Sequence, residues 1–362
     1  MQVAYSLTSE LLEVKLKFYE IHIVASSNFF TELALDRSVS SSIDFHQIKN
    51  TPSFGFRGLA ARIELDKLEQ KLKPRCIFSL FGPAFWKPKG FHIVGFAVGW
   101  AINSSSVAYR VLPFHKKVYW WLKNWIKLKY ALYEGSVFVV ESRLTKYKLI
   151  KVARVPNHKI KVIHNACPKH YSFEVNTKRL KLKERLSKNE FRCITIANNY
   201  RHKNLQILKE VIPILNERGL NVKFYITIDE AEFQKTFGSP NPFIENLGPL
   251  KISDCPSIYS QCDALFLPTL LESFTVSYLE AMAMLKPILT SNLDFARDIC
   301  GNAAVYFNPL DAMDIAKKIQ FIIENPNFTQ DLIARGKDQL SLYPTAKERA
   351  HSYLDLCKKL SN

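Results

Sequence analysis

Apolar runs and stretches of helical spacing alternate along the second half of the chain. The buried strands that these runs predict are 192–197, 221–228, 264–269 and 286–291, with "AAVYF" (303–307) after them. The helices predicted between and after them are 204–219, 255–262, 276–285 and 312–324. Strands separated by helices are typical of βαβ units, so a parallel sheet is expected here.

The first half repeats this alternation less regularly. Strands are predicted over 19–27, 75–82, 91–99, 136–142 and 160–166. Apolar residues at Val3, Leu7, Leu11 and Val14 have the spacing of a helix. The expected fold class is α/β, with two doubly wound parallel-sheet domains that face a cleft.

Length and composition favour the same division. A chain of 362 residues with 47% apolar residues is globular and too long for one ordinary core. We expect a first domain over 1–170, a lysine-rich connection over 171–190 and a second domain over 191–345, with a last helix (about 346–362) that is able to pack back on the first domain. The seven scattered cysteines favour a reducing compartment. The longest apolar run, 91–102, is shorter than the ~20 residues that a membrane span needs.

Charge is distributed unevenly between the halves. Residues 1–190 contain 32 basic and 14 acidic residues, whereas the remainder contains 18 and 19. The basic excess predicts that the first half meets a polyanion, which is either a membrane surface or a nucleic acid.

Two carboxylates, Glu272 and Glu280, lie where the predicted strand 264–269 turns into the helix 276–285. Each alone fits an ordinary helix acid. However, open α/β sheets bind ligands at the carboxyl ends of their strands, and backbone amides at a helix start can meet a phosphate. Lys203 occupies another strand-to-helix turn of the same domain. Carboxylates can accept hydrogen bonds from sugar hydroxyls, and a lysine with free backbone amides can bind phosphates. Together these groups predict a nucleotide-sugar pocket.

The segment "PTLLESFTVSYLEAMAMLKPILTS" (268–291) resembles the Glu-x7-Glu motif of the retaining group 1 glycosyltransferases (family 4), which have the GT-B fold. The similarity extends through "RHKNLQIL", "NLGPL" and "DICGNAAVYFNP", and weakly through residues 79–100.

The resemblance implies a role for each matching position. Glu272 would hold hydroxyls of the donor sugar, Glu280 the ribose diol, and Lys203 the diphosphate leaving group. The remaining donor-binding positions that it implies are Ser273, Phe274, Thr275, Val276, Asn198, Arg201 and Gly248. No metal and no cofactor are expected, because no Asp-x-Asp pair occurs and the donor is itself a substrate.

Four positions depart from the family pattern. Thr275 replaces a glycine, Asn198 replaces an arginine, and Gly99 with Trp100 stand where the family has a histidine. The first strand and its glycine-rich loop are missing ahead of the first helix. The expectation is therefore that the natural start lies upstream or that the chain is a truncated, inactive form.

Residues 114–132 predict an amphipathic helix. Val118, Trp121, Leu122, Trp125, Ile126 and Leu128 are expected to pack on the sheet. The opposite, lysine-rich face is expected either to be merely solvated or to touch anionic lipid. It carries Lys116, Lys117, Trp120, Lys123 and Lys127.

These observations predict a retaining hexosyltransferase that moves a sugar from a nucleotide-diphospho-sugar to a saccharide or lipid-linked saccharide. We expect it at the inner face of the cell membrane, in the synthesis of a surface polysaccharide such as lipopolysaccharide. The alternatives within the fold are an inactive GT-B protein and a nucleotide-sugar epimerase. The alternative outside it is a basic nucleic-acid-binding protein, which no recognisable nucleic-acid motif supports.

Overall fold

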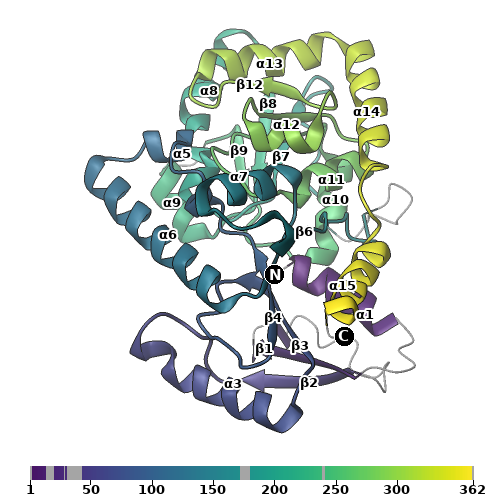
Figure 1. Ribbon diagram of the computed structural model, residues 1–362. Coiled ribbons are helices and arrows are strands. Elements are labelled where there is room, and N and C mark those ends of the chain that lie inside the picture. The colour runs from purple at the N-terminus through teal and green to yellow at the C-terminus, as the bar shows by residue number, and fades with distance from the viewer. Residues whose placement is uncertain are drawn as a thin grey trace. The chain divides into compact units, whose positions relative to one another are not determined.

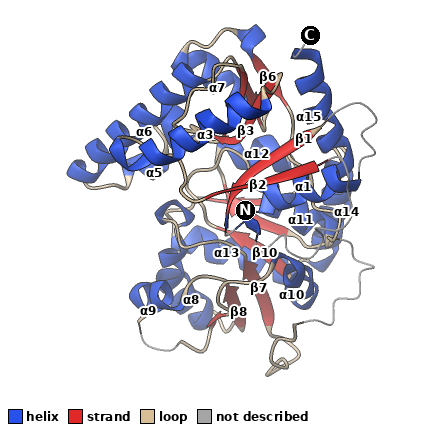
Figure 2. Ribbon diagram, turned by 90° about the horizontal axis from the view of Figure 1, so that it is seen from below, coloured by secondary structure: helices blue, strands red, loops and turns tan. Residues whose placement is uncertain are grey.

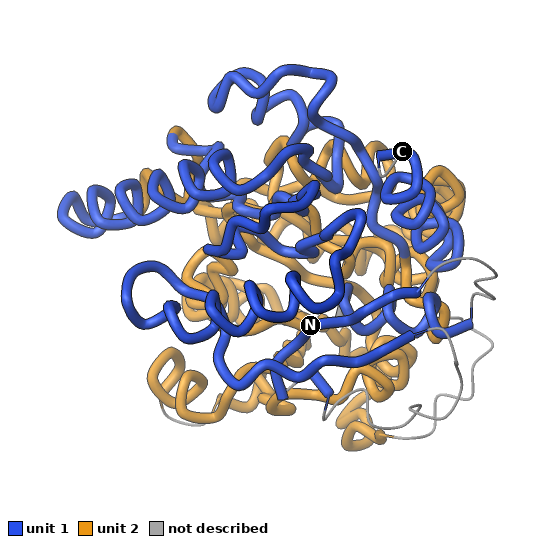
Figure 3. Tube along the Cα trace, turned by 60° about the horizontal axis from the view of Figure 1, so that its bottom comes forward, with its two compact units in different colours: residues 1–104, 112–166, 344–362 blue, residues 105–111, 167–343 orange. Residues whose placement is uncertain are grey.

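The computed structural model describes residues 2–13, 20–27, 29–30, 43–171, 180–238 and 241–360. The chain forms two compact units (Figure 3). Unit 1 comprises residues 1–104, 112–166 and 344–362, and unit 2 comprises residues 105–111 and 167–343. Residues 14–17 of the first predicted helix and 172–179 of the predicted connection lie outside the described residues.

Unit 2 is built on a six-stranded parallel sheet in the order β12-β11-β10-β7-β8-β9. Figure 2 labels its strands β7, β8 and β10. The strands are β7 (Phe191–Thr195), β8 (Val222–Ile226), β9 (Ile244–Asn246), β10 (Ala264–Leu267), β11 (Ile288–Ser291) and β12 (Val305–Phe307). Cys193 of β7 pairs with Ala264 of β10 in the middle of the sheet. The four apolar runs predicted as strands therefore form strands, and β9 is a strand that the sequence did not predict.

Each of the helices described in unit 2 buries apolar residues. They are α5 (Val107–Arg110), α8 (Leu208–Glu217), α9 (Glu230–Phe237), α10 (Cys255–Gln261), α11 (Val276–Ala283), α12 (Asp294–Cys300), α13 (Ala312–Glu324) and α14 (Pro326–Leu340). Helices α8 and α13 contribute the buried Leu208, Val211, Ile315 and Ile319 to a core that also contains Phe266.

Residues 180–190 are bonded to unit 2. The Leu182 amide donates to Gln261 on α10 (2.8 Å), and Arg185 forms a two-pronged pair with Asp263 (2.8 and 2.9 Å). Residues that lie between the lysines of this segment therefore anchor it to the rest of unit 2.

Unit 1 contains a four-stranded parallel sheet and a separate parallel pair. The sheet has the order β3-β4-β5-β6, and β1 pairs with β2. Their bounds are β1 (Ile21–Ser26), β2 (Ile43–Ile48), β3 (Cys76–Gly82), β4 (Phe91–Phe96), β5 (Val137–Val140) and β6 (Ile160–Val162). The sequence predicted all of these strands except β2.

The helices of unit 1 include segments from both ends of the chain. They are α1 (Gln2–Glu13), α3 (Leu59–Leu72), α4 (Gly99–Ile102), α6 (Phe114–Glu134), α7 (Arg143–Ala153) and α15 (Ala346–Leu360). Helices α1 and α15 lie side by side (Figure 1). The buried Arg349 of α15 donates to Ser6 of α1 (3.0 Å) and to Asn165 after β6 (3.2 Å), so α15 completes this unit.

Helix α6 forms where the sequence predicts it, but it is rotated about its axis from the predicted orientation. Val118, Trp121, Leu122 and Trp125, which were expected to pack on the sheet, are 43–49% exposed. The buried residues are Asn124, Leu128, Ala131 and Glu134, and Trp120 stacks on Trp100 of α4 (5.0 Å between ring centroids). The small Ala131, together with Asn124 bonded back to the Trp120 carbonyl (2.7 Å), allows this side to approach the sheet closely. Trp121 and Trp125 therefore face outward, whereas Trp120 packs against α4.

Candidate functional site

The turn after β7 and the loop after β10 are bonded together at the carboxyl edge of the unit 2 sheet. β7 and β10 are neighbours, so the segments that follow them emerge side by side. The His202 carbonyl accepts hydrogen bonds from the Leu270 amide (2.7 Å) and from the Thr269 hydroxyl (3.1 Å). Asn204 ends the turn in the left-handed region (φ 57°), and its side-chain amide donates to the Pro309 carbonyl (2.8 Å).

These contacts bring Lys203 and Glu272 together, although 69 residues separate them in the sequence. Lys203 Nζ lies 2.6 Å from Glu272 Oε1, and the side chains are only 14% and 12% exposed. Thr269 Oγ1 lies 2.9 Å from the same oxygen, so the Thr269 hydroxyl shares its one proton between Glu272 and the His202 carbonyl. The pair is thus a partly desolvated cation and carboxylate held on rigid strand ends, where ligands of open α/β sheets bind.

His202 is a member of this cluster that the sequence analysis did not select. Its ring stacks on Tyr200 (5.7 Å between centroids, 10° between planes). The pKa of His202 lies below its ordinary value, chiefly because the ring is buried. The Glu272 carboxylate opposes this shift, and the Lys203 charge adds to it. Its position beside Lys203 in "RHK" was the available signal. Its backbone carbonyl, next to Lys203 in the sequence, accepts the hydrogen bonds that join the two loops.

Glu280 has different surroundings from Glu272. It lies within α11, is 1% exposed, and accepts a hydrogen bond from the Tyr259 hydroxyl (3.2 Å). Burial, and after it the Glu280 charge, raises the pKa values of Cys167, Tyr171 and Tyr259. Glu280 takes no part in the Lys203–Glu272 contact. Sequence reasoning placed the two acids in one pocket but missed Tyr259.

The loop that leads into α11 contains the other predicted positions of the motif. Phe274 is buried against Tyr343 (5.9 Å between ring centroids), and Ser273 and Val276 are half-buried. Thr275 is the N-cap residue of α11, but its side chain makes no capping hydrogen bond. The first amides of α11 are therefore not capped by that hydroxyl.

The remaining predicted donor-binding residues lie on neighbouring loops. Asn198 and Arg201 are exposed on the turn after β7. Gly248 follows β9 with φ 68°, a left-handed conformation that favours glycine, and its amide donates to Asn246 Oδ1 (3.3 Å). In the described part of the chain, no group of three or more His, Cys, Asp or Glu side chains is placed to hold a metal ion. Within the same residues, no helix is both long and apolar enough to cross a membrane.

Comparisons with known proteins point to one group of enzymes. Residues 176–339 match the family model described as glycosyl transferases group 1. The chain is 23% identical over 226 residues to the capsular polysaccharide biosynthesis glycosyltransferase CapM of Staphylococcus aureus. That match covers 59% of this chain and 58% of CapM, so it spans little more than half of the relative.

Solved structures are similar over almost the entire chain. A glycosyltransferase from Rickettsia africae has a TM-score of 0.67 at 16% identity and covers 95% of this chain and 99% of its own. Anabaena HepE in complex with UDP and glucose has a TM-score of 0.69 at 13% identity and covers 99% and 95%. The fold is therefore that of the GT-B glycosyltransferases, with parallel sheets in two domains.

Proposed function

We propose that the chain is a glycosyltransferase that uses a nucleotide-diphospho-sugar as donor and retains the configuration of the anomeric carbon. The observation that carries this proposal is the Lys203–Glu272 pair at the carboxyl edge of the unit 2 sheet. It lies within the segment that matches the group 1 glycosyltransferase model. The HepE structure, whose description names UDP and glucose, supports the class of donor.

In this proposal the protein stabilises charge rather than supplying a nucleophile. Lys203 stabilises the negative charge that develops on the diphosphate leaving group, and Glu272 accepts hydrogen bonds from hydroxyls of the donor sugar. Glu280 binds the ribose diol and Gly248 lies beside the base. The leaving phosphate accepts the proton of the attacking hydroxyl, so no side-chain base, metal or cofactor takes part.

The proposed acceptor is a saccharide, in its lipid-linked form, during synthesis of a surface polysaccharide. The name of the Staphylococcus relative, which refers to capsular polysaccharide, supports the pathway class. The basic excess of residues 1–190 supports an anionic membrane surface as a partner.

Helix α6 is the element that we propose contacts this membrane. Trp121 and Trp125 stack on each other (6.4 Å between centroids) on its exposed side, and Lys129 lies over the Trp125 ring (5.5 Å). Indole rings favour the membrane–water interface, and lysines near it attract anionic headgroups. The tryptophan side therefore replaces Trp120 as the proposed insertion face. Lys127 is half-buried, which lowers its pKa, and it belongs less to this surface than Lys116, Lys117 and Lys123.

A transfer assay tests the proposed chemistry. UDP-, GDP- and ADP-sugars are each incubated with the full chain and a lipid-linked acceptor from a surface-polysaccharide pathway, and the product is analysed by NMR. We expect one donor to give product with the anomeric configuration of the donor. A product of inverted configuration would contradict the retaining mechanism.

A further inference from the structure

Two cavities of unit 1 meet at the carboxyl-terminal end of α6. One has a volume of about 580 Å³ and the other about 400 Å³. Both are lined by Lys87, Tyr133 and Glu134, so they adjoin along these residues, and we refer to the two together as the groove. Their volumes fall in the range of small-molecule sites. We call the larger cavity the basic end and the smaller one the aromatic end.

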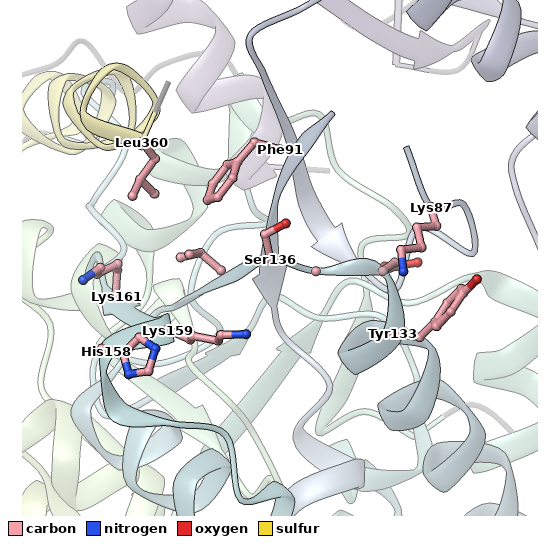
Figure 4. A pocket seen from close by; sticks show the side chains of 11 residues that line it. Lys87, Phe91, Tyr133, Ser136, His158, Lys159, Lys161 and Leu360 are labelled. Atoms are coloured by element: carbon pink, nitrogen blue, oxygen red, sulfur yellow. The ribbon is translucent and has the colours of Figure 1, made fainter. Parts of the chain in front are cut away.

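The basic end brings cationic side chains together from separate segments. Lys87 comes from the loop between β3 and β4, and Lys159 and Lys161 come from the start of β6. Figure 4 shows Lys87 with Tyr133 at one side of this cavity, Lys159 and Lys161 with His158 at the other, and Ser136 between them. Among the residues that the structure describes, none of these lysines forms an ion pair with a carboxylate.

Glu134 does not neutralise the lysines of the basic end. Its carboxyl group is 3% exposed and accepts a hydrogen bond from the Ala84 amide (2.6 Å). Burial raises its pKa to about 7, although backbone amides around Ala84 oppose the shift. Three lysines line this cavity with one carboxyl group, so the cavity keeps a net positive charge in either protonation state of Glu134.

The aromatic end provides a surface of the opposite kind. Phe54 and Phe85 both pack on Tyr130, at 5.4 and 5.3 Å between ring centroids. Leu59 and Ile63 of α3 are 47% and 46% exposed beside them. Arg62 and Asp66 also line this cavity, but Arg62 donates to the Ser53 and Gly55 carbonyls and Asp66 accepts from the Trp86 indole. The aromatic and aliphatic side chains can stabilise a hydrocarbon chain or the apolar face of a ring.

The basic end lies away from the ligand-binding edge of its sheet. It is lined by Phe91, Val137 and the residues around Ile160, which are the first residues of β4, β5 and β6. Open parallel sheets bind their substrates at the opposite, carboxyl edge. The groove is therefore separate from any substrate site of the usual kind in unit 1.

We propose that this groove binds an amphiphilic phosphate, with the phosphate group at Lys87, Lys159 and Lys161 and the apolar part along Phe54, Phe85 and Tyr130. The chemistry is that of a phospholipid headgroup with the start of its chains, or of a soluble phosphate ester with an apolar substituent. The inference does not rest on the proposed donor chemistry, because none of its residues belongs to unit 2.

Short-chain dihexanoyl phosphatidic acid is the probe for the test, with inorganic phosphate as the reference ligand. Calorimetry measures both with the full chain carrying Lys203→Ala, which removes phosphate binding at the proposed donor site. Two double variants are compared, Lys159→Gln/Lys161→Gln in the basic end and Phe54→Ser/Phe85→Ser in the aromatic end. Lys67→Gln/Lys71→Gln on α3 is the matched control for charge.

We expect the lipid probe to bind at least tenfold more tightly than inorganic phosphate. The basic-end variant should weaken both ligands about tenfold or more, the magnitude of a lost charge-assisted contact, whereas the control should change neither. The aromatic-end variant should weaken only the lipid probe. If inorganic phosphate binds as tightly as the lipid probe, or if the control weakens binding as much as the basic-end variant, the proposal is overturned.

A second comparison separates the two sources of the ligand. Vesicles of phosphatidylcholine containing phosphatidic acid are offered alongside a soluble ester, phenyl phosphate. If the natural ligand is a lipid headgroup, the basic-end variant should lose vesicle binding although α6 is unchanged. If the ligand is a soluble ester, the variant should lose only the binding of phenyl phosphate. Unchanged binding to both would again overturn the proposal.

Discussion

Glu272 and Glu280 differ in surroundings although only eight residues separate them. Glu272 is paired with Lys203 at 2.6 Å, whereas Glu280 is buried in α11 with Tyr259 as its hydrogen-bond donor. A buried acid with a neutral partner either binds a ligand hydroxyl or serves the core alone. Substitutions that separate charge from shape distinguish these roles.

Glu280→Gln keeps the shape of the side chain and removes its charge. We expect this substitution to weaken the binding of a nucleoside diphosphate by ~1.5–3 kcal/mol, because a charge-assisted hydrogen bond to the ribose is lost. Tyr259→Phe, which leaves the carboxylate in place but removes a hydrogen bond to it, should lower stability by ~1.5–3 kcal/mol with little effect on affinity. Calorimetry and thermal unfolding measure the two quantities. Unchanged affinity in Glu280→Gln with a lowered melting temperature would make Glu280 a structural residue.

Glu134 makes the stability of unit 1 depend on pH. Its pKa is about 7 in the folded chain and near 4.5 in the unfolded chain, so the folded state binds more protons between these values. The contribution of Glu134 to the free energy of unfolding is complete below pH 4.5 and is lost as the pH rises through 7. The difference is roughly 2–3 kcal/mol.

Urea unfolding at pH 5 and pH 8 measures this effect. The stability of Glu134→Gln should change less with pH than that of the wild type, by that amount. The glutamine retains an acceptor for the Ala84 amide but does not titrate. Glu217→Gln, at an exposed position of α8, should leave the pH dependence unchanged. Equal pH dependence in wild type and Glu134→Gln would show that Glu134 is not the titrating group.

At the scale of elements, sequence patterns predicted most of the strands and several of the helices, but not the helices α3, α7, α9, α12 and α14 or the orientation of α6. Runs such as "ALFL" (264–267) are apolar at every position, so their burial between helices does not depend on which face of the strand is considered. In α6, tryptophans occupy one side and the small Ala131 another, and hydrophobicity alone favours burial of the tryptophans. The close approach of Asn124 and Ala131 decides the packing, and it depends on neighbours such as Trp100 that a local pattern does not contain. Strand β2, "IDFHQI", was missed because its apolar alternation is broken by polar residues.

The revised orientation of α6 changes which tryptophan is needed for membrane binding. Trp121→Ser/Trp125→Ser should weaken binding to anionic vesicles about tenfold or more and should hardly change the melting temperature, because both rings are 43–49% exposed. Trp120→Ala should instead lower the melting temperature, since its ring stacks on Trp100. Vesicle sedimentation and thermal unfolding provide the two readouts.

Tyr147→Ser is the matched control, because Tyr147 is a 52% exposed aromatic residue on another helix of unit 1. It should bind vesicles like the wild type. Binding should also fall as salt rises, because lysines attract anionic lipid only within about 8 Å at physiological salt. Binding that is equal for neutral and anionic vesicles at every salt concentration would refute the electrostatic part of the proposal.

At the scale of the molecule, the α/β class and the parallel sheets were predicted from the alternation of strands and helices, and the GT-B assignment from the motif of residues 268–291. The site was predicted in part. Lys203 and Glu272 were placed at strand ends from the sequence, and the structure brings them into contact. The supporting bonds from Thr269 and Leu270 to His202 were not predicted, because they depend on β7 and β10 being neighbours. Strand order is a long-range property that local patterns do not contain.

The central claim is that the carboxyl edge of unit 2 binds a nucleoside diphosphate through Lys203. Titration calorimetry of the full chain with UDP, GDP and ADP tests it directly, with Lys203→Ala and the exposed Lys209→Ala on α8 as matched variants. We predict that at least one of the three nucleotides binds with one site per chain, that Lys203→Ala weakens it by ~1.5–3 kcal/mol, and that Lys209→Ala binds it like the wild type. Absence of binding for all three nucleotides, or an unchanged affinity in Lys203→Ala, would contradict the claim.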